Sequence, residues 1–248
     1  MRTRTRALLL LALGLGLALA AVCLYFAFKG YDTLYRVESK EEKPHLYVVP
    51  RPLSLTPCTI KRSTTLTYSR FSVDVPWSGK EDETQYEKFV QTNFNSGIAV
   101  LLGEIRAAEG PVATLRQQGD ETRRGWEATL SPNALKSQYD FYETMLNTTP
   151  ESISIRTNPR KLIGLQMILF LKDLMLRGDI DVYSFGTETV KGFQINRGSY
   201  DSIEILAFDS ADTGLAITIV PPKHSNVRIS QEEMDCVIQS IRPADEPR

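Results

Sequence analysis

The side chains that could carry out chemistry are few in this 248-residue chain, which has three cysteines and two histidines. Cys23 lies in a long apolar stretch, so Cys58 and Cys236 remain as an even pair. In an oxidising compartment two such thiols typically form a disulfide. We predict that Cys58 bonds to Cys236; the alternative is two separate thiols, buried or free.

The position of Cys236 on its predicted helix favours this bond. Between Gln231 and Ile241 the apolar residues have the spacing of one buried helix face, and Cys236 falls on the opposite face. A free thiol on an exposed face outside the cytoplasm is unusual. The bond should pin the chain around Cys58 over the outer face of this last helix. Closing a loop of roughly 180 residues stabilises a fold by up to ~5 kcal/mol in the chain-entropy model.

Hydrolytic chemistry has one candidate base, His224, because His45 lies in a predicted linker where we expect it to be solvated. No Gly-x-Ser-x-Gly or Ser-x-x-Lys pattern accompanies His224. We interpret His224 as a loop residue, and a hydrolase that uses it as the alternative function.

Acidic residues do not gather with the spacing of a cation site. Asp201, Asp209 and Asp212 do not match a helix–loop–helix calcium loop, and we expect a hairpin turn there. We expect Glu81-Asp82-Glu83 to form a solvated loop. Cys-x-x-Cys, His-x-x-x-His and the glycine-rich nucleotide patterns are absent from the sequence, so neither a metal nor a cofactor is predicted.

The first 28 residues predict a membrane anchor. Arg2, Arg4 and Arg6 precede a 22-residue stretch, Ala7–Phe28, that carries no charge. At about 1.5 Å per residue this stretch can cross a bilayer as a single helix. Positive flanks stay in the cytoplasm, so the rest of the chain should be periplasmic or extracellular.

Two alternatives to an uncleaved anchor remain open. Ala18-Leu19-Ala20 fits the cleavage site of a signal peptide, although apolar residues continue to Phe28. Cys23 could be lipidated, although Val22 stands where a small residue should precede it.

Beyond residue 28 the chain has 26 basic and 30 acidic residues, a net charge of −4. This balance predicts no nucleic-acid binding. We divide this part into a proline-containing linker (29–63), one folded domain (64–242) and a tail (243–248), because the linker composition cannot bury much apolar surface.

The folded domain is predicted to be α+β. Alternation and apolar runs predict the strands Phe71–Val75, Phe89–Phe94, Ile98–Ile105, Asp181–Thr187, Lys191–Arg197, Ser202–Phe208 and Leu215–Val220. Helices should begin at Ser131-Pro132, at Asn158-Pro159 and, through a capping box of Ser230 and Glu233, at Gln231. The short turns after Ile180 predict an antiparallel meander, so we expect an antiparallel sheet flanked by helices, an α/β/α sandwich.

The helix Pro159–Arg177 is apolar almost all round, so its apolar surface must be covered. Lys172-Asp173 interrupts it, and it is too short to be a second membrane span. A core helix, a partner or dimer face, and contact with a membrane surface remain open. If the helix is exposed, Ile168, Leu169 and Leu171 are the candidate binding residues.

Basic residues concentrate in two places, which could meet anionic lipid or an acidic partner, or could serve solubility alone. They are Arg106, Arg116, Arg123 and Arg124, and then Arg156, Arg160 and Lys161.

The order of elements resembles one family. A strand that ends in Pro-Trp (Phe71–Trp77), the meander from Tyr183 to Val220 and a closing helix from Ser230 to Ile241 resemble the PsbP-like and DcrB-like α/β/α sandwiches of exported proteins. The resemblance implies a non-enzymatic helper of membrane-associated complexes and assigns no catalytic residues.

We therefore predict a membrane-anchored, extracytoplasmic module that binds a protein partner in the envelope or assembles a complex. Besides the hydrolase, a small-ligand carrier is an alternative. Its closed apolar cavity would be lined by Phe170, Tyr183 or Phe185.

Overall fold

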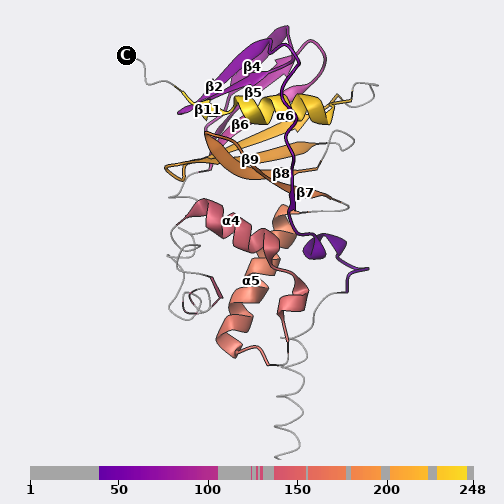
Figure 1. Ribbon diagram of the computed structural model, residues 1–248, viewed down its shortest axis with the longest axis vertical. Helices are drawn as coiled ribbons and strands as arrows, with labels where there is room; N and C mark the ends of the chain where they lie inside the picture. Colours follow the sequence, from indigo (N-terminus) through magenta and orange to yellow (C-terminus); the bar gives the residue numbers. More distant parts are fainter. Residues whose placement is uncertain are drawn as a thin grey trace, which may run out of the picture.

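The computed structural model describes residues 39–105, 124, 127, 129–130, 137–154, 156–176, 180–196, 202–222 and 228–244. Over these residues the chain is α+β, with an eight-stranded and a three-stranded sheet and helices on both faces of the large sheet (Figure 1).

The large sheet is mixed, which corrects the expectation of an antiparallel sheet. Its strands follow the order β1-β7-β8-β9-β10-β6-β5-β4. Only the short β1 runs parallel to its neighbour, pairing Arg51 with Tyr183 and Pro52 with Ser184. The strands are β1 (Arg51–Pro52), β4 (Lys80–Gln85), β5 (Phe89–Phe94), β6 (Ala99–Ile105), β7 (Val182–Gly186), β8 (Val190–Ile195), β9 (Ile203–Asp209) and β10 (Gly214–Val220).

The predicted meander is confirmed from β7 to β10, where each strand pairs antiparallel with the next along the chain. On β9, Ile203 and Ile205 face one core while Leu206 and Phe208 face the other. Both faces of the central strands are therefore covered, which explains why their sequence is almost continuously apolar.

On one face of the large sheet lie α6 (Gln231–Ser240) and the small sheet, which has the order β11-β3-β2 (Figure 1). Its strands are β2 (Thr64–Tyr68), β3 (Phe71–Val75) and β11 (Arg242–Pro243). Ser230 and Glu233 form the predicted capping box of α6. Val73 of β3, Ile205 of β9 and Val237 of α6 share the first hydrophobic core.

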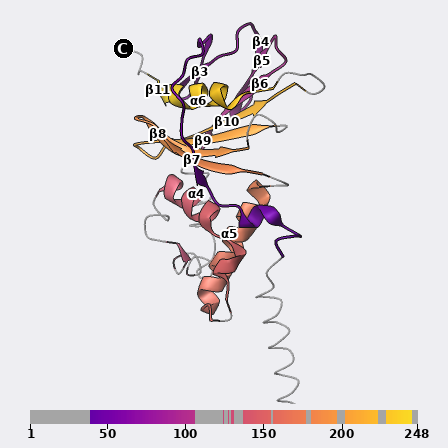
Figure 2. The same cartoon turned by 45° about the vertical axis from the view of Figure 1, so that its right-hand side comes forward.

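The opposite face carries α4 (Gln138–Asn147) and α5 (Pro159–Met175), with the short helix η2 (Pro150–Ser152) between them (Figure 2). Phe141 of α4, Ile168 of α5 and Phe193 of β8 meet in the second core. The predicted beginning of α4 at Ser131-Pro132 lies outside the described residues, and the helix that the structure describes is capped by Ser137.

The acidic cluster Glu81-Asp82-Glu83 is not a loop, as we expected, but part of the edge strand β4. All six residues of β4 are exposed, and they pair with β5 on one side only. Charged side chains on an open edge discourage pairing with other chains, so the composition that suggested a loop suits an edge strand.

Part of the predicted linker packs against the domain. Residues 43–63, here called the N-terminal strap, contain η1 (Pro44–Tyr47) and β1, and run past β7 towards α6 (Figure 1). His45, expected to be solvated, is buried, and Leu53 and Leu55 pack against the first core. Leucines scattered among prolines give no periodic signal, so the sequence did not reveal this packing.

Among the helices of the described residues, none combines the length and the hydropathy that crossing a bilayer requires. Residues 7–28, where the sequence predicts the span, lie outside the described part of the chain.

Candidate functional site

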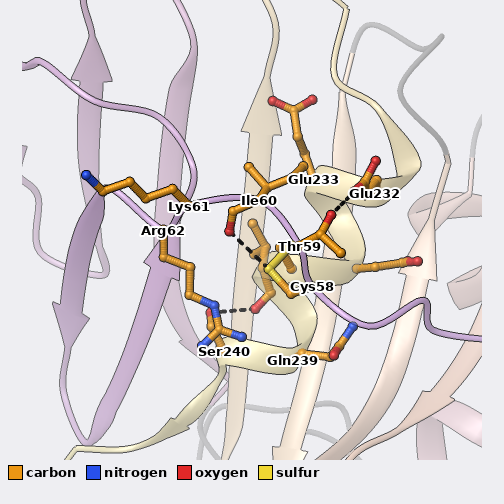
Figure 3. The surroundings of a disulfide bond; sticks show 12 residues. Cys58, Thr59, Ile60, Lys61, Arg62, Glu232, Glu233, Gln239 and Ser240 are labelled. Atoms are coloured by element: carbon orange, nitrogen blue, oxygen red, sulfur yellow. Dashed lines mark hydrogen bonds between the residues drawn. A yellow bond between two sulfur atoms is a disulfide. The ribbon is translucent and has the colours of Figure 1, made fainter.

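Cys58 and Cys236 form the predicted disulfide, which joins the N-terminal strap to α6 across 178 residues of sequence (Figure 3). Cys236 lies on the outer face of α6, as its place on the helix predicted, yet it is fully buried. The strap covers it. A disulfide of this kind fits an oxidising compartment.

Hydrogen bonds on both sides of the disulfide hold the strap on α6. The backbone N–H of Thr56 donates to Asp235 at 2.9 Å, and the Gln239 amide donates to the Thr56 carbonyl at 2.6 Å. The Thr59 hydroxyl donates to Glu232 at 2.6 Å (Figure 3). The outer face of α6 is therefore sealed by the protein's own chain.

Helix α5, the predicted candidate for a binding surface, begins as expected. The Asn158 side chain caps it by accepting from the Arg160 N–H at 2.9 Å, and Pro159 occupies the first turn. Its predicted end at Arg177, with Gly178 after it, lies outside the described residues.

The three α5 residues named as candidates face inward rather than outward. Ile168 is 0% exposed, Leu169 is 9% exposed, and Leu171 is partly buried against the second core. These side chains hold α5 on the domain, so they are not open to a partner in this structure.

The exposed apolar residues of α5 are Ile163 (41%), Phe170 (61%) and Leu174 (50%). Phe170 and Leu174 follow Ile163 by seven and eleven residues, so the three side chains lie along one line of the helix, on the side opposite Ile168. We call these three residues the α5 outer face. Single exposed apolar residues are common, but three aligned on one helix make a continuous apolar stripe.

Lys172 lies on the inner side of α5 and is 0% exposed. Its Nζ donates to three backbone carbonyls, those of Val48 at 2.7 Å, Leu146 at 2.7 Å and Thr148 at 2.8 Å. Leu146 and Thr148 are at the C-terminal end of α4, where the helix dipole favours a cation. The ammonium therefore joins α4, α5 and the strap at one point.

Burial lowers the pKa of Lys172 to about 8, because the apolar surroundings disfavour the charged form. The three carbonyls favour that form. Sequence reasoning took Lys172 only as an interruption of the apolar helix. The missed signal was its position, seven residues after Leu165 and four after Ile168, on the buried line of α5.

The strap also contacts α5 at Asp173, next to the outer face. Asp173 accepts from Lys43 Nζ at 2.9 Å and lies 2.6 Å from His45 Nε2. The hydrogen bond from Lys43, more than that from His45, holds the pKa of the Asp173 carboxyl below its usual value. This pairing fixes the point at which the described chain reaches α5.

Of the basic residues noted in the sequence, Arg156, Arg160 and Lys161 are exposed at and just before the first turn of α5. Arg124 is exposed as well, whereas Arg106, Arg116 and Arg123 lie outside the described residues. One end of α5 therefore combines positive charge with the first apolar residue of its outer face.

The predicted hairpin turn at Asp209 and Asp212 is confirmed between β9 and β10, and both carboxylates serve the fold. Asp209 accepts from the Ala211 and Thr213 N–H groups and pairs with Arg70 at 2.9 Å. Asp212 accepts from the backbone N–H of Tyr139 at 3.1 Å, at the beginning of α4. In the described part of the chain no acidic, histidine and cysteine side chains gather as a metal site needs.

For the two alternative functions, the structure describes only the residues named for the ligand carrier. His224 and Asp201 lie outside the described residues. Phe170 is exposed, while Tyr183 and Phe185 are buried on β7.

A scan against models of known protein families finds no match, and a search of curated protein sequences finds none either.

Proposed function

We propose that the chain is a single-pass membrane protein with a cytoplasmic N-terminus. Its α+β domain, on the periplasmic or extracellular side, binds a partner protein or helps to assemble a complex without catalysing a reaction. The uncharged stretch 7–28 after three arginines supports the anchor, and the Cys58–Cys236 disulfide supports the compartment.

The single observation that carries a contact with another body, a partner protein or a membrane surface, is the α5 outer face. Its three large apolar side chains are exposed and lie on one side of the helix. A stripe of this kind is typical of a surface that contacts another body. The resemblance to PsbP-like and DcrB-like exported sandwiches, whose implied role is to help membrane complexes, supports the same proposal.

A topology reporter tests the compartment. An enzyme that is active only in an oxidising compartment is fused after Arg248, and a matched fusion after Arg6 serves as the cytoplasmic control. The proposal expects activity from the C-terminal fusion alone. Activity of a cytosol-specific reporter at the same C-terminal position would contradict it.

In-cell photo-cross-linking tests the partner. A photoreactive amino acid replaces one of two exposed aromatic residues, Phe170 on α5 or Tyr86 next to the edge strand β4. We expect at least one position to give a discrete protein adduct that mass spectrometry identifies as an envelope protein. If neither position gives such an adduct in correctly inserted protein, the interaction role is wrong.

A further inference from the structure

An apolar stripe such as the α5 outer face is typically covered by another body, and two features of the chain favour one kind of body. Helix α5 has 17 residues and is therefore about 25 Å long. Ile163 lies near its beginning and Leu174 near its end, so the apolar stripe runs almost its full length. A flat body that lies along the helix would cover the stripe better than a small ligand.

The first argument is the path of the chain. The described residues begin at Ser39, and Lys43 binds Asp173, the neighbour of Leu174. The predicted membrane span ends at Phe28. The residues between Phe28 and Lys43 can extend over at most about 50 Å. The end of α5 that carries Leu174 therefore lies within about 50 Å of the end of the predicted span.

The second argument is charge. Arg156, Arg160 and Lys161 are exposed at the other end of α5, and no acidic residue occurs between Ser152 and Lys172. Anionic lipid attracts such residues with about 1 kcal/mol for each cation near the surface. In a dimer whose two α5 helices run parallel, these like charges would lie against each other.

We infer that the α5 outer face lies on the surface of the membrane that anchors the chain, at a bilayer containing anionic lipid. This inference rests on the proposed anchor. Ile163, Phe170 and Leu174 enter the boundary between headgroups and acyl chains, which interfacial helices penetrate by about 5–10 Å. Arg160, three residues before Ile163 and on the neighbouring side of the helix, remains at the level of the lipid phosphates.

This placement orients the whole domain. In both views α5 lies at one end of the described structure, and β4 and β5 lie at the other end (Figures 1 and 2). Helix α5 itself runs along the long axis of the molecule in both views, so a bilayer on its outer face lies parallel to that axis, and β4 and the exposed Tyr86 lie further along the molecule, outside the contact stripe.

Tryptophan quenching by brominated lipid tests the inference in the full-length chain. Phe170→Trp is reconstituted into vesicles of brominated phosphatidylcholine with phosphatidylglycerol, and the unsubstituted protein supplies the baseline for the native tryptophans. Tyr86→Trp is the matched control, since it also replaces an exposed aromatic residue. We expect additional quenching for Phe170→Trp and none for Tyr86→Trp.

Each other outcome is decisive. If Phe170→Trp is not quenched although the protein resists carbonate extraction, α5 does not rest on the bilayer while the anchor stands; a protein then covers this face. If carbonate removes the protein, the proposed anchor and the inference both fail. Quenching that is equal in purely neutral vesicles, or unchanged by Arg160→Gln with Lys161→Gln, overturns the role of anionic lipid.

Discussion

Helices α6 and α5 cover opposite faces of the same sheet, but the outer surface of α6 is covered by the chain and that of α5 is exposed. The outer face of α6 contains Cys236, and the N-terminal strap covers it with a disulfide and three hydrogen bonds. The outer face of α5 exposes Phe170 and Leu174. The chain itself thus covers the outer face of α6, and the exposed face of α5 is the basis of our proposal that something outside the domain covers it.

The two sides also use different means of attachment. On α6 a covalent bond fixes the strap, and its strength does not depend on pH in the acidic and neutral range. On α5 the attachment is polar. The buried ammonium of Lys172 binds one strap carbonyl and two carbonyls at the C-terminal end of α4. Asp173 pairs with Lys43 and His45 of the strap. Buried polar groups such as the Lys172 ammonium and its carbonyl acceptors stabilise a fold only while each of them keeps its hydrogen-bond partner. Substitutions can remove the contacts on the α6 side and those on the α5 side separately.

The largest effect should come from removing the disulfide. We expect Cys58→Ser with Cys236→Ala to lower the free energy of unfolding by about 2–5 kcal/mol, because the unfolded chain is no longer constrained. Urea unfolding of the full-length protein in detergent measures it. A reductant added to the unsubstituted protein should reproduce the loss, and an unchanged midpoint in both experiments would contradict the sealing role.

Two neighbouring apolar residues of α5 should differ sharply. Ile168→Ala empties a fully buried position and should cost about 2–5 kcal/mol of unfolding free energy. Phe170→Ala removes an exposed side chain and should change it by less than about 0.5 kcal/mol. Equal losses in thermal or urea unfolding would show that Phe170 is covered within the domain, and the contrast between α5 and α6 would then disappear.

Lys172→Met should lower the free energy of unfolding by about 2–4 kcal/mol, since the carbonyls of Val48, Leu146 and Thr148 lose their donor. The methionine keeps most of the volume, so packing changes little. The comparison variant is Lys161→Met, on the exposed first turn of α5, for which we expect almost no change. An unchanged free energy of unfolding for Lys172→Met would mean that the hydrogen bonds of Lys172 do not stabilise the fold.

The same lysine gives a pH dependence with a defined sign. Its pKa is about 8 in the folded protein against 10.5 ordinarily. Between these values the unfolded chain holds a proton that the folded chain has released, so stability rises with pH, by about 1–3 kcal/mol in all. Unfolding measured from pH 8 to 10 should show this rise in the unsubstituted protein and not in Lys172→Met. If the stability of both proteins changed with pH in the same way, the pKa of Lys172 in the folded protein would lie near its ordinary value.

The smallest effect concerns the cap that β9 and β10 supply to α4. Asp212→Ala removes acceptors for Ser137 Oγ and the Tyr139 N–H and should cost about 1–2 kcal/mol. Amide exchange should become faster in the first turn of α4 and stay unchanged in α6. A uniform increase in both helices would contradict a local role.

Much of the fold could be predicted because its signals are local. Ser230 and Glu233 define the beginning of α6, and Asn158-Pro159 the beginning of α5. The alternation in Phe71–Val75 gives β3, whose residues are buried in the same alternation. The pairing of Cys58 with Cys236 followed from helix geometry together with a count of thiols.

The remaining features depend on tertiary contacts that have no local signal. Nothing periodic in Lys80–Gln85 distinguishes a charged edge strand from a loop. The composition around Arg51 and Pro52 predicts a linker, and these two residues form a strand only because they pair with the edge of β7. For the candidate surface, the sequence could not distinguish the buried residues of α5 from the exposed ones, because a helix that is apolar all round does not show which residues the sheet will cover.

The central claim is that the domain is sealed on its α6 side in an oxidising compartment, and thiol trapping in intact cells tests it most directly. Cells are treated with a permeant alkylating agent before lysis, and the protein is digested without reduction for mass spectrometry. We expect a linked peptide pair that contains Cys58 and Cys236, with neither residue alkylated. Recovery of both residues as alkylated thiols would contradict the disulfide in the cell and, with it, the proposed location of the domain.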